Sequence, residues 1–174
     1  MSPRRSSASR AELERTVQQS VLDRLIDLSP HERSEPASTW AQSVRELKRS
    51  VRRDLEALLN TRRTAQPAPD ALPEVKASLY NYGLPDISSM SRDAHDSRVR
   101  LLRMVEDAIS TYEPRLTNVR AALVEDPESN AIRRDLHFVI HAVLRMDPNP
   151  EPVMFDTTLD ASSGEYQLTG DAGA

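Results

Sequence analysis

The spacing of apolar residues changes once along this chain, close to Pro114, and this change constrains the fold most. Before Pro114 the apolar residues recur three and four positions apart, which indicates amphipathic helices. After it they alternate with polar residues, which is typical of strands with one buried face. Helices followed by strands indicate an α+β fold, in which a small antiparallel sheet of three to four strands is covered by helices.

The first of three main helices is expected at residues 9–28. Ser9 and Glu12 form the S-x-x-E pattern of a capping box, in which Glu12 can bond back to the amide of the capping residue. Apolar residues then follow at helical spacing as far as "LSP", residues 28–30, where proline prevents the helix from continuing. Residues 1–8 are basic and rich in serine, and we expect them to be disordered.

The second and third helices are expected at residues 39–60 and 91–112, with Ser91 as the cap of the third. A short helical turn over residues 74–82 lies between them. Gly83 follows that turn directly and is expected to end it in a left-handed conformation, because glycine adopts a positive φ without a steric penalty.

Four segments after Pro114 have the alternation of strands: 119–123, 136–146, 153–160 and 165–168. "ASSG", residues 161–164, is a hairpin signal between the last two. We therefore expect a helical part over 9–112 and a β part over 115–168, which together make one domain. Residues 169–174 are expected to form a loose tail.

The composition excludes several kinds of site. The chain has no cysteine, so it forms no disulfide and has no thiolate nucleophile. It has 23 basic and 27 acidic residues, and a net charge of −4 argues against a general nucleic-acid binder. No apolar run approaches the roughly 20 residues that a membrane helix needs. We expect a soluble, intracellular protein that does not insert into a membrane.

No metal or other cofactor is expected. His137 and His141 have the spacing that suits zinc on a helix, but on a strand they lie about 13 Å apart. That separation is too large for a single metal with bonds of about 2 Å. We expect both histidines on the solvent side of their strand. The chain also has only four glycines and no glycine-rich phosphate loop, so nucleotide binding has no support.

Glu113, Pro114 and Arg115 lie where the helical pattern ends. The acid could be catalytic, or it could belong to an ion pair that locks a helix to the sheet or to a partner. Asp54 is one candidate for the second carboxylate that a glycosidase requires, although nothing in the spacing favours it over chance. The fixed φ of Pro114 suits a rigid docking corner. We therefore predict a latch that binds a partner.

Two other features are candidate binding surfaces. The second helix and the residues after it carry a run of basic side chains: Arg45, Lys48, Arg49, Arg52, Arg53, Arg62 and Arg63. Such a run is usually a solvated face, and the more specific interpretation is a docking surface for an acidic protein. The sheet also has two edges, and an exposed edge can accept a strand from another chain unless it is covered.

Several stretches together resemble the TssE family, the baseplate subunits of bacterial type VI secretion systems. The stretches are "SVLDRLIDLSP" (20–30), "SVRRDLEALLNTRR" (50–63), "SLYNYGLPDISS" (78–89), "YEPRL" (112–116) and "PEPVMFDTTLDASSGEYQL" (150–168). This family is itself similar to the small wedge protein of contractile phage baseplates, long labelled "lysozyme-like". The resemblance extends from about Val17 to Leu168.

The resemblance implies a structural protein without enzymatic activity. Members of the family join a wedge with TssF and TssG and help to initiate the contractile sheath of TssB and TssC. TssK and the hub of the spike and tube are further expected partners. The resemblance places the assembly in the cytoplasm, on the inner-membrane complex. The alternative is a lysozyme-like cell-wall hydrolase with Glu113 as general acid.

The resemblance also implies three groups of partner-binding residues and no catalytic residue. The groups are Leu22, Asp23, Arg24 and Leu25; Arg53, Asp54, Leu59, Asn60 and Arg62; and Glu113, Pro114 and Arg115.

Overall fold

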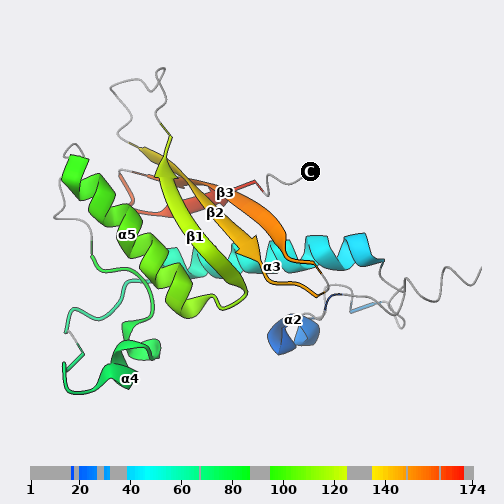
Figure 1. Ribbon diagram of the computed structural model, residues 1–174, viewed down its shortest axis with the longest axis horizontal. Helices are drawn as coiled ribbons and strands as arrows, with labels where there is room; N and C mark the ends of the chain where they lie inside the picture. Colours follow the sequence, from blue (N-terminus) through cyan, green and yellow to red (C-terminus); the bar gives the residue numbers. More distant parts are fainter. Residues whose placement is uncertain are drawn as a thin grey trace, which may run out of the picture. The chain divides into compact units, whose positions relative to one another are not determined.

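The computed structural model describes residues 17, 20–26, 30–31, 39–66, 68–86, 95–124, 135–147, 149–160 and 162–170 (Figure 1). The chain divides into two compact units between Val51 and Arg52, within a long helix. In the first unit, the structure describes α2, Val21–Leu25, and the start of α3, Trp40–Asn60. The predicted tail at 1–8 lies outside the described residues.

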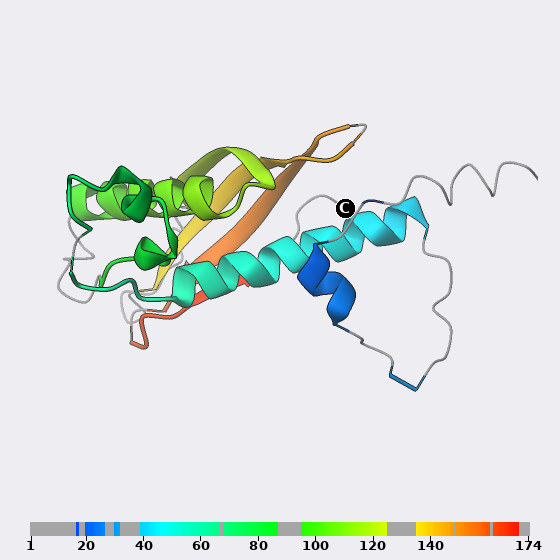
Figure 2. The same ribbon diagram turned by 90° about the horizontal axis from the view of Figure 1, so that it is seen from below.

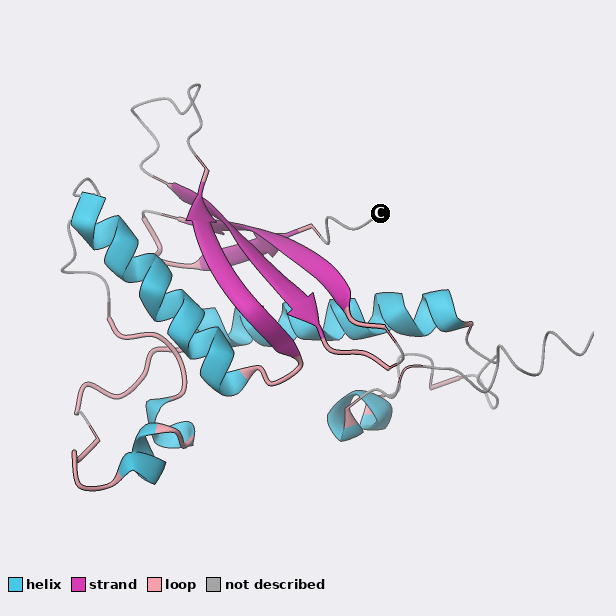
Figure 3. Cartoon of the chain, viewed as in Figure 1, coloured by secondary structure: helices cyan, strands magenta, loops and turns pink. Residues whose placement is uncertain are grey.

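The second unit contains the end of α3, further helices and one sheet. Its remaining helical elements are α4 (Pro73–Lys76), the 3-10 turn η1 (Leu79–Asn81) and α5 (His95–Tyr112). Its strands are β1 (Leu116–Leu123), β2 (Leu136–Leu144), β3 (Glu151–Leu159) and β4 (Tyr166–Thr169). The strands pair antiparallel in the order β1-β2-β3-β4 (Figure 3). This arrangement confirms the α+β prediction.

One face of the sheet is buried and the other is open, because side chains alternate along each strand. The buried side chains of β2 and β3 are Phe138, Ile140, Ala142, Leu144, Val153, Phe155, Thr157 and Leu159. The residues between them are exposed or half-buried. His137 and His141 belong to this second set and are exposed, as the sequence predicted.

Helices cover the buried face. α5 buries an apolar stripe and contacts β1 (Figures 1 and 2). The last turns of α3 form hydrogen bonds near both outer edges of the sheet. Asp54 bonds to Arg115, beside β1, and Asn60 bonds to Tyr166 in β4. Because β1 and β4 are the outer strands, this part of α3 crosses the buried face.

The predicted first helix is wrong at Ser20. That residue is extended, with φ −60° and ψ 158°, and its Oγ accepts a hydrogen bond from the Asp23 backbone N–H at 3.1 Å. Serine therefore caps the start of a new short helix, because its hydroxyl replaces a missing helical acceptor. This helix ends at Leu25, and the capping box predicted at Ser9 lies outside the described residues.

The predictions for residues 74–82 and for the third helix are largely confirmed. α4 and η1 occupy the predicted turn, and Gly83 follows them with a φ of 97°. α5 ends at Tyr112 as expected. Its predicted cap, Ser91, lies outside the described residues.

β1 begins earlier than expected and contains a bulge. Asn118 has a φ of 54°, and the pairing with β2 slips by one residue between Thr117 and Arg120. Because of this extra residue, Leu116 and Val119 are both buried although they are three positions apart. The sequence predicted a simple alternation that places Val119, Ala121 and Leu123 on one face. In the structure Val119 is buried, whereas Ala121 and Leu123 are only half-buried.

The β3–β4 turn confirms the hairpin signal at 161–164. One carboxylate oxygen of Asp160 accepts hydrogen bonds from the Ser162 backbone N–H at 2.6 Å, the Ser162 hydroxyl at 2.6 Å and the Ser163 backbone N–H at 2.9 Å. These bonds, with the hydroxyl bond as the largest contribution, lower the pKa of Asp160 from 3.8 to about 2. The charged carboxylate thus organises the turn.

This pKa predicts a defined pH dependence for Asp160→Asn. A pKa lowered on folding contributes stability that is present above about pH 4 and is lost as the pH falls through about 2. The wild type should therefore exceed the variant in free energy of unfolding at pH 7, and the difference should shrink between pH 4 and pH 2. Urea unfolding across this range measures it, and a difference independent of pH would contradict the role of the charge.

Candidate functional site: the charged corner between α5 and β1

The backbone turns sharply between α5 and β1. The Glu113 N–H donates the last helical bond to the Ile109 carbonyl at 2.9 Å, and the Leu116 N–H then donates to the Glu113 carbonyl at 3.1 Å. Pro114 lies between them and has no N–H with which to continue the helix. The Arg115 carbonyl accepts from the Arg145 N–H at 2.8 Å, which joins the corner to the residue after β2.

Arg115 holds two carboxylates at this corner. Its Nε donates to Glu113 Oε1 at 2.6 Å, and its Nη2 donates to Glu113 Oε2 at 2.5 Å. The same Nη2 donates to Asp54 Oδ2 of α3 at 2.6 Å. Arginine suits this position because its planar fork can bind a carboxylate through two parallel bonds. The guanidinium therefore connects α3 to the end of α5 within one chain.

The corner is substantially removed from water. The exposed fractions of the side chains are 6% for Glu113, 24% for Arg115 and 33% for Asp54. Hydrogen bonding to Glu113, followed by hydrogen bonding to Asp54, raises the pKa of Arg115 above its ordinary value, although burial acts in the opposite direction. Asp54 also accepts from Arg53 at 2.8 Å, and this second pair lies nearer to solvent.

The geometry argues against Glu113 as a general acid. Both of its oxygens face Arg115, and its exposed fraction of 6% leaves little room for a substrate. The structure does bring Asp54 and Glu113 together, but a shared arginine links them. A glycosidase pair instead flanks a bond of the substrate. The arrangement is a latch that locks the helix to the sheet of the same chain, and binding of a partner at this latch stays a prediction.

Tyr82 is a neighbour of the corner that the sequence did not single out. Its ring packs edge-to-face on Tyr112, with the ring centroids 5.2 Å apart. Burial raises the pKa of Tyr82, and the charges of Asp54 and Glu113 add to this effect. The only signal in the sequence was its position directly before Gly83.

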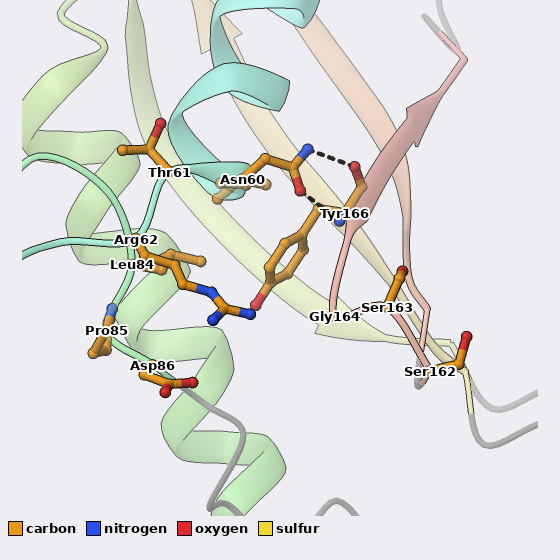
Figure 4. Close-up of a pocket in the computed structure, with 11 residues that line it drawn as sticks. Asn60, Thr61, Arg62, Leu84, Pro85, Asp86, Ser162, Ser163, Gly164 and Tyr166 are labelled. Carbon is orange, nitrogen blue, oxygen red and sulfur yellow. Dashed lines mark hydrogen bonds between the residues drawn. The ribbon is translucent and has the colours of Figure 1, made fainter.

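Asn60 forms a second connection between α3 and the sheet. Its Nδ2 donates to the Tyr166 carbonyl at 2.8 Å, and its Oδ1 accepts from the Tyr166 N–H at 2.8 Å (Figure 4). The side-chain amide therefore bonds β4 as a neighbouring strand would. Leu59, beside it, is buried. Arg62 lines a shallow pocket of about 190 Å³ next to this contact.

The predicted residues of α2 have two different environments. Asp23 Oδ2 accepts from the Ser20 hydroxyl at 2.5 Å and from the Ser50 hydroxyl at 2.7 Å, which connects α2 to α3 within the first unit. Leu22 and Leu25 are 61% and 76% exposed. Arg24 is also exposed. Both leucines therefore lie outside the buried core, and their binding of a partner stays a prediction.

The predicted basic face of α3 is smaller than expected. Lys48 is only 5% exposed and is not part of a solvated surface. Arg45, Arg49 and Arg53 are exposed, and Arg53 pairs with Asp54. Because Lys48 is buried and Arg53 pairs with Asp54, the described part of the helix offers a smaller basic surface than the sequence predicted.

Within the described parts of the chain, no group of three or more histidine, aspartate or glutamate side chains could hold a metal ion. None of the helices in those parts is long and apolar enough to cross a membrane.

Comparisons with known proteins identify the family. One solved structure, "The baseplate complex from the type VI secretion system", has 18% sequence identity and a TM-score of 0.41, covering 64% of this chain and 94% of that chain. No curated protein matches the sequence significantly. The family model described as "Baseplate wedge protein gp25" matches residues 45–149, which is more than half of the chain. This match confirms the resemblance seen in the sequence, and the chain belongs to the baseplate wedge protein gp25 family.

Proposed function

We propose that this chain is a structural subunit of a type VI secretion baseplate. In this role it joins the wedge of TssF and TssG, on the cytoplasmic side of the inner-membrane complex, and helps to initiate polymerisation of the TssB–TssC sheath. The observation that carries the proposal is the family match over residues 45–149. That segment includes most of α3, the charged corner and all of β2.

The geometry of the charged corner supports a structural role rather than a catalytic one. The ion pairs of Arg115 and the side-chain hydrogen bonds of Asn60 hold helices to the sheet. A structural subunit needs such rigid joints, whereas a catalytic acid needs access to a substrate. Leu22 and Leu25 provide an exposed apolar surface of the kind that a protein partner covers.

Co-expression of the full chain with TssF and TssG, followed by size-exclusion chromatography, tests the proposal. The wild type should elute with both partners. Leu22→Ser/Leu25→Ser should lower the recovered complex at least about tenfold, since burial of two leucines at an interface contributes more than about 1.4 kcal/mol. The fold should survive, because both side chains are exposed.

Leu79→Ser is the matched control, because Leu79 is 79% exposed and lies outside the predicted partner-binding residues. This variant should elute with the wedge as the wild type does. A wild-type chain that stays separate from TssF and TssG would overturn the proposal. Equal losses in both variants would show that the effect of the α2 leucines is not specific.

A further inference from the structure

The shallow pocket beside Asn60 lies where the end of α3 meets the turn between β3 and β4. Its walls come from residues 59–62, residues 84–86, and residues 162–164 with Tyr166 (Figure 4). All of them belong to the second unit. The volume of about 190 Å³ is below the roughly 300–1,000 Å³ of pockets that enclose a cofactor or a drug-sized ligand. The pocket therefore suits a single amino-acid side chain.

Hydrogen bonds fix the three walls to one another. The Thr61 carbonyl accepts from the Leu84 N–H at 2.9 Å, and the Leu84 carbonyl accepts from the Arg63 N–H at 2.9 Å. The side-chain amide of Asn60 bonds both backbone groups of Tyr166. Because the pocket is already formed, an occupant does not need to order its walls, and this lowers the cost of binding.

Arg62 supplies the positive charge of the pocket. Its side chain extends from the end of α3 toward the space between Asp86 and the β3–β4 turn (Figure 4). A Cβ added to Gly164 would lie 3.9 Å from Arg62 Nη2, which places the guanidinium beside that turn. Among the residues that the structure describes, none forms a hydrogen bond or an ion pair with this guanidinium. Arg62 can therefore bind an acceptor from outside.

Most other polar side chains of the pocket are occupied within the chain. Asn60, Thr61 and Ser162 already donate from their side chains to oxygen atoms of other residues. The Ser163 hydroxyl oxygen accepts a backbone N–H at 3.2 Å, so its hydrogen remains to donate. Arg62 and Ser163 thus offer donors to an occupant, and donors of this kind favour a carboxylate.

Asp86 is the acidic residue of the pocket. An occupant could in principle be a cation held by Asp86 or an anion held by Arg62. Asp86 takes part in a further interaction of its own, whereas the Arg62 guanidinium has no acceptor among the described residues. The anion is therefore the better match.

We propose that this pocket binds the side chain of a glutamate or an aspartate from a partner protein in the wedge, with the carboxylate against Arg62. The planar guanidinium can hold a carboxylate through two parallel hydrogen bonds. Leu84 and Pro85 add apolar atoms to the wall, which suit the methylene groups of such a side chain. The inference rests on the proposed function, because the wedge supplies the partner, and it names the contact and its chemistry.

Arg62→Gln and Arg63→Gln form a matched pair of variants. Both residues are exposed, but only Arg62 lines the pocket, so the two changes remove the same charge at neighbouring positions. We expect Arg62→Gln to weaken the affinity of the full-length chain for purified TssF–TssG at least tenfold, and Arg63→Gln to weaken it less than threefold. Surface plasmon resonance measures the affinity, and thermal unfolding checks each fold.

Asp86→Asn tests the sign of the charge on the occupant. This change removes a negative charge from the pocket, so an acidic side chain should bind at least as tightly as it does to the wild type. Weaker binding by a folded Asp86→Asn variant would indicate a cationic occupant and overturn the inference.

Carbodiimide cross-linking of Arg62→Lys identifies the occupant directly, because the reagent joins an amine to a carboxylate. Lys48 and Lys76 are the lysines of the chain, so a product at position 62 is easily recognised by mass spectrometry. With TssF–TssG present, we expect a link from position 62 to a glutamate or an aspartate of one of these partners. Arg63→Lys is the control and should give at least tenfold less of any such product.

The possible outcomes separate this inference from the proposed function. Unchanged affinity in Arg62→Gln, or equal losses in both glutamine variants, would overturn the pocket contact while the wedge role stands. A link from position 62 to Asp86 of the same chain that persists unchanged in the complex would show that no partner side chain fills the pocket. A wild-type chain that does not bind TssF–TssG would instead count against the proposed function.

Two other occupants give results of their own. A link between two copies of this chain would assign the pocket to a second copy and overturn the inference. Loss of affinity in Arg62→Gln without any link to a partner from position 62 would indicate a small free anion and overturn it as well.

Discussion

Replacing Arg115 with methionine should lower the free energy of unfolding by about 3 kcal/mol, because it leaves a buried carboxylate without its cation. Glu113 is 6% exposed, and its remaining bond would be the backbone N–H of residue 115 at 3.2 Å. The partial exposure of Arg115 and Asp54 places the cost at the lower end of the range for broken buried pairs. Urea unfolding measures the change.

Two controls separate the buried pair from a general loss of charge. Arg53→Met removes the neighbouring pair with Asp54, whose side chains are 47% and 33% exposed, and should cost no more than about 0.5 kcal/mol. Glu113→Gln/Arg115→Met removes both buried charges and should recover much of the lost stability. A cost for Arg115→Met no larger than that for Arg53→Met would contradict the latch.

The latch also changes how a partner-binding role of this corner must be tested. From the sequence alone, Arg115→Glu is expected to abolish assembly with the wedge while the isolated fold survives. In the structure this substitution places a third carboxylate between Glu113 and Asp54, so we expect it to destabilise the fold itself. Pro114 is exposed, and Pro114→Ser tests the same surface while both ion pairs remain.

Gly83→Ala should also lower the free energy of unfolding by at least about 3 kcal/mol, since two penalties combine. The φ of 97° is a conformation that costs an L-residue about 1–2 kcal/mol. An added Cβ would in addition lie 2.1 Å from the Thr61 carbonyl oxygen. That oxygen accepts from the Leu84 N–H at 2.9 Å, so the clash cannot relax without loss of this contact between Leu84 and the residue that follows α3.

Gly164→Ala is the matched control for the second penalty. Gly164 has a φ of 74°, but the nearest atom to an added Cβ is Arg62 Nη2 at 3.9 Å. We therefore expect a cost of about 1 kcal/mol from the backbone conformation alone. Thermal and urea unfolding of the two variants should differ clearly, and equal costs would show that the close approach to Thr61 is relieved by a small shift.

The sequence determined the elements of this protein that follow from local chemistry. The spacing of apolar residues predicted α3, α5 and β2, because a helix and a strand expose one side at different periods. Pro114 predicted the corner, since proline ends a helix wherever it occurs in the interior. Gly83 predicted a left-handed conformation, because glycine adopts a positive φ without a steric penalty. The family resemblance also depended on sequence alone.

Other local features carried no readable signal. Ser20 was hidden in an apolar pattern that continues through it, although its hydroxyl caps a new helix. The bulge at Asn118 depends on the pairing of β1 with β2. Because of the bulge, Leu116 and Val119 both face the core although they are three positions apart. Alternation within one strand does not reveal such a slip, because a bulge is a property of two strands.

Only the tertiary structure decided what the charged residues do. Arg115 meets Asp54 across 61 positions of sequence, and Asn60 meets Tyr166 across 106. Hydrogen bonds are short and directional, so their partners depend on how whole elements pack and not on spacing along the chain. For the same reason the pairing of β4 with only part of β3 could be seen only when the sheet was assembled.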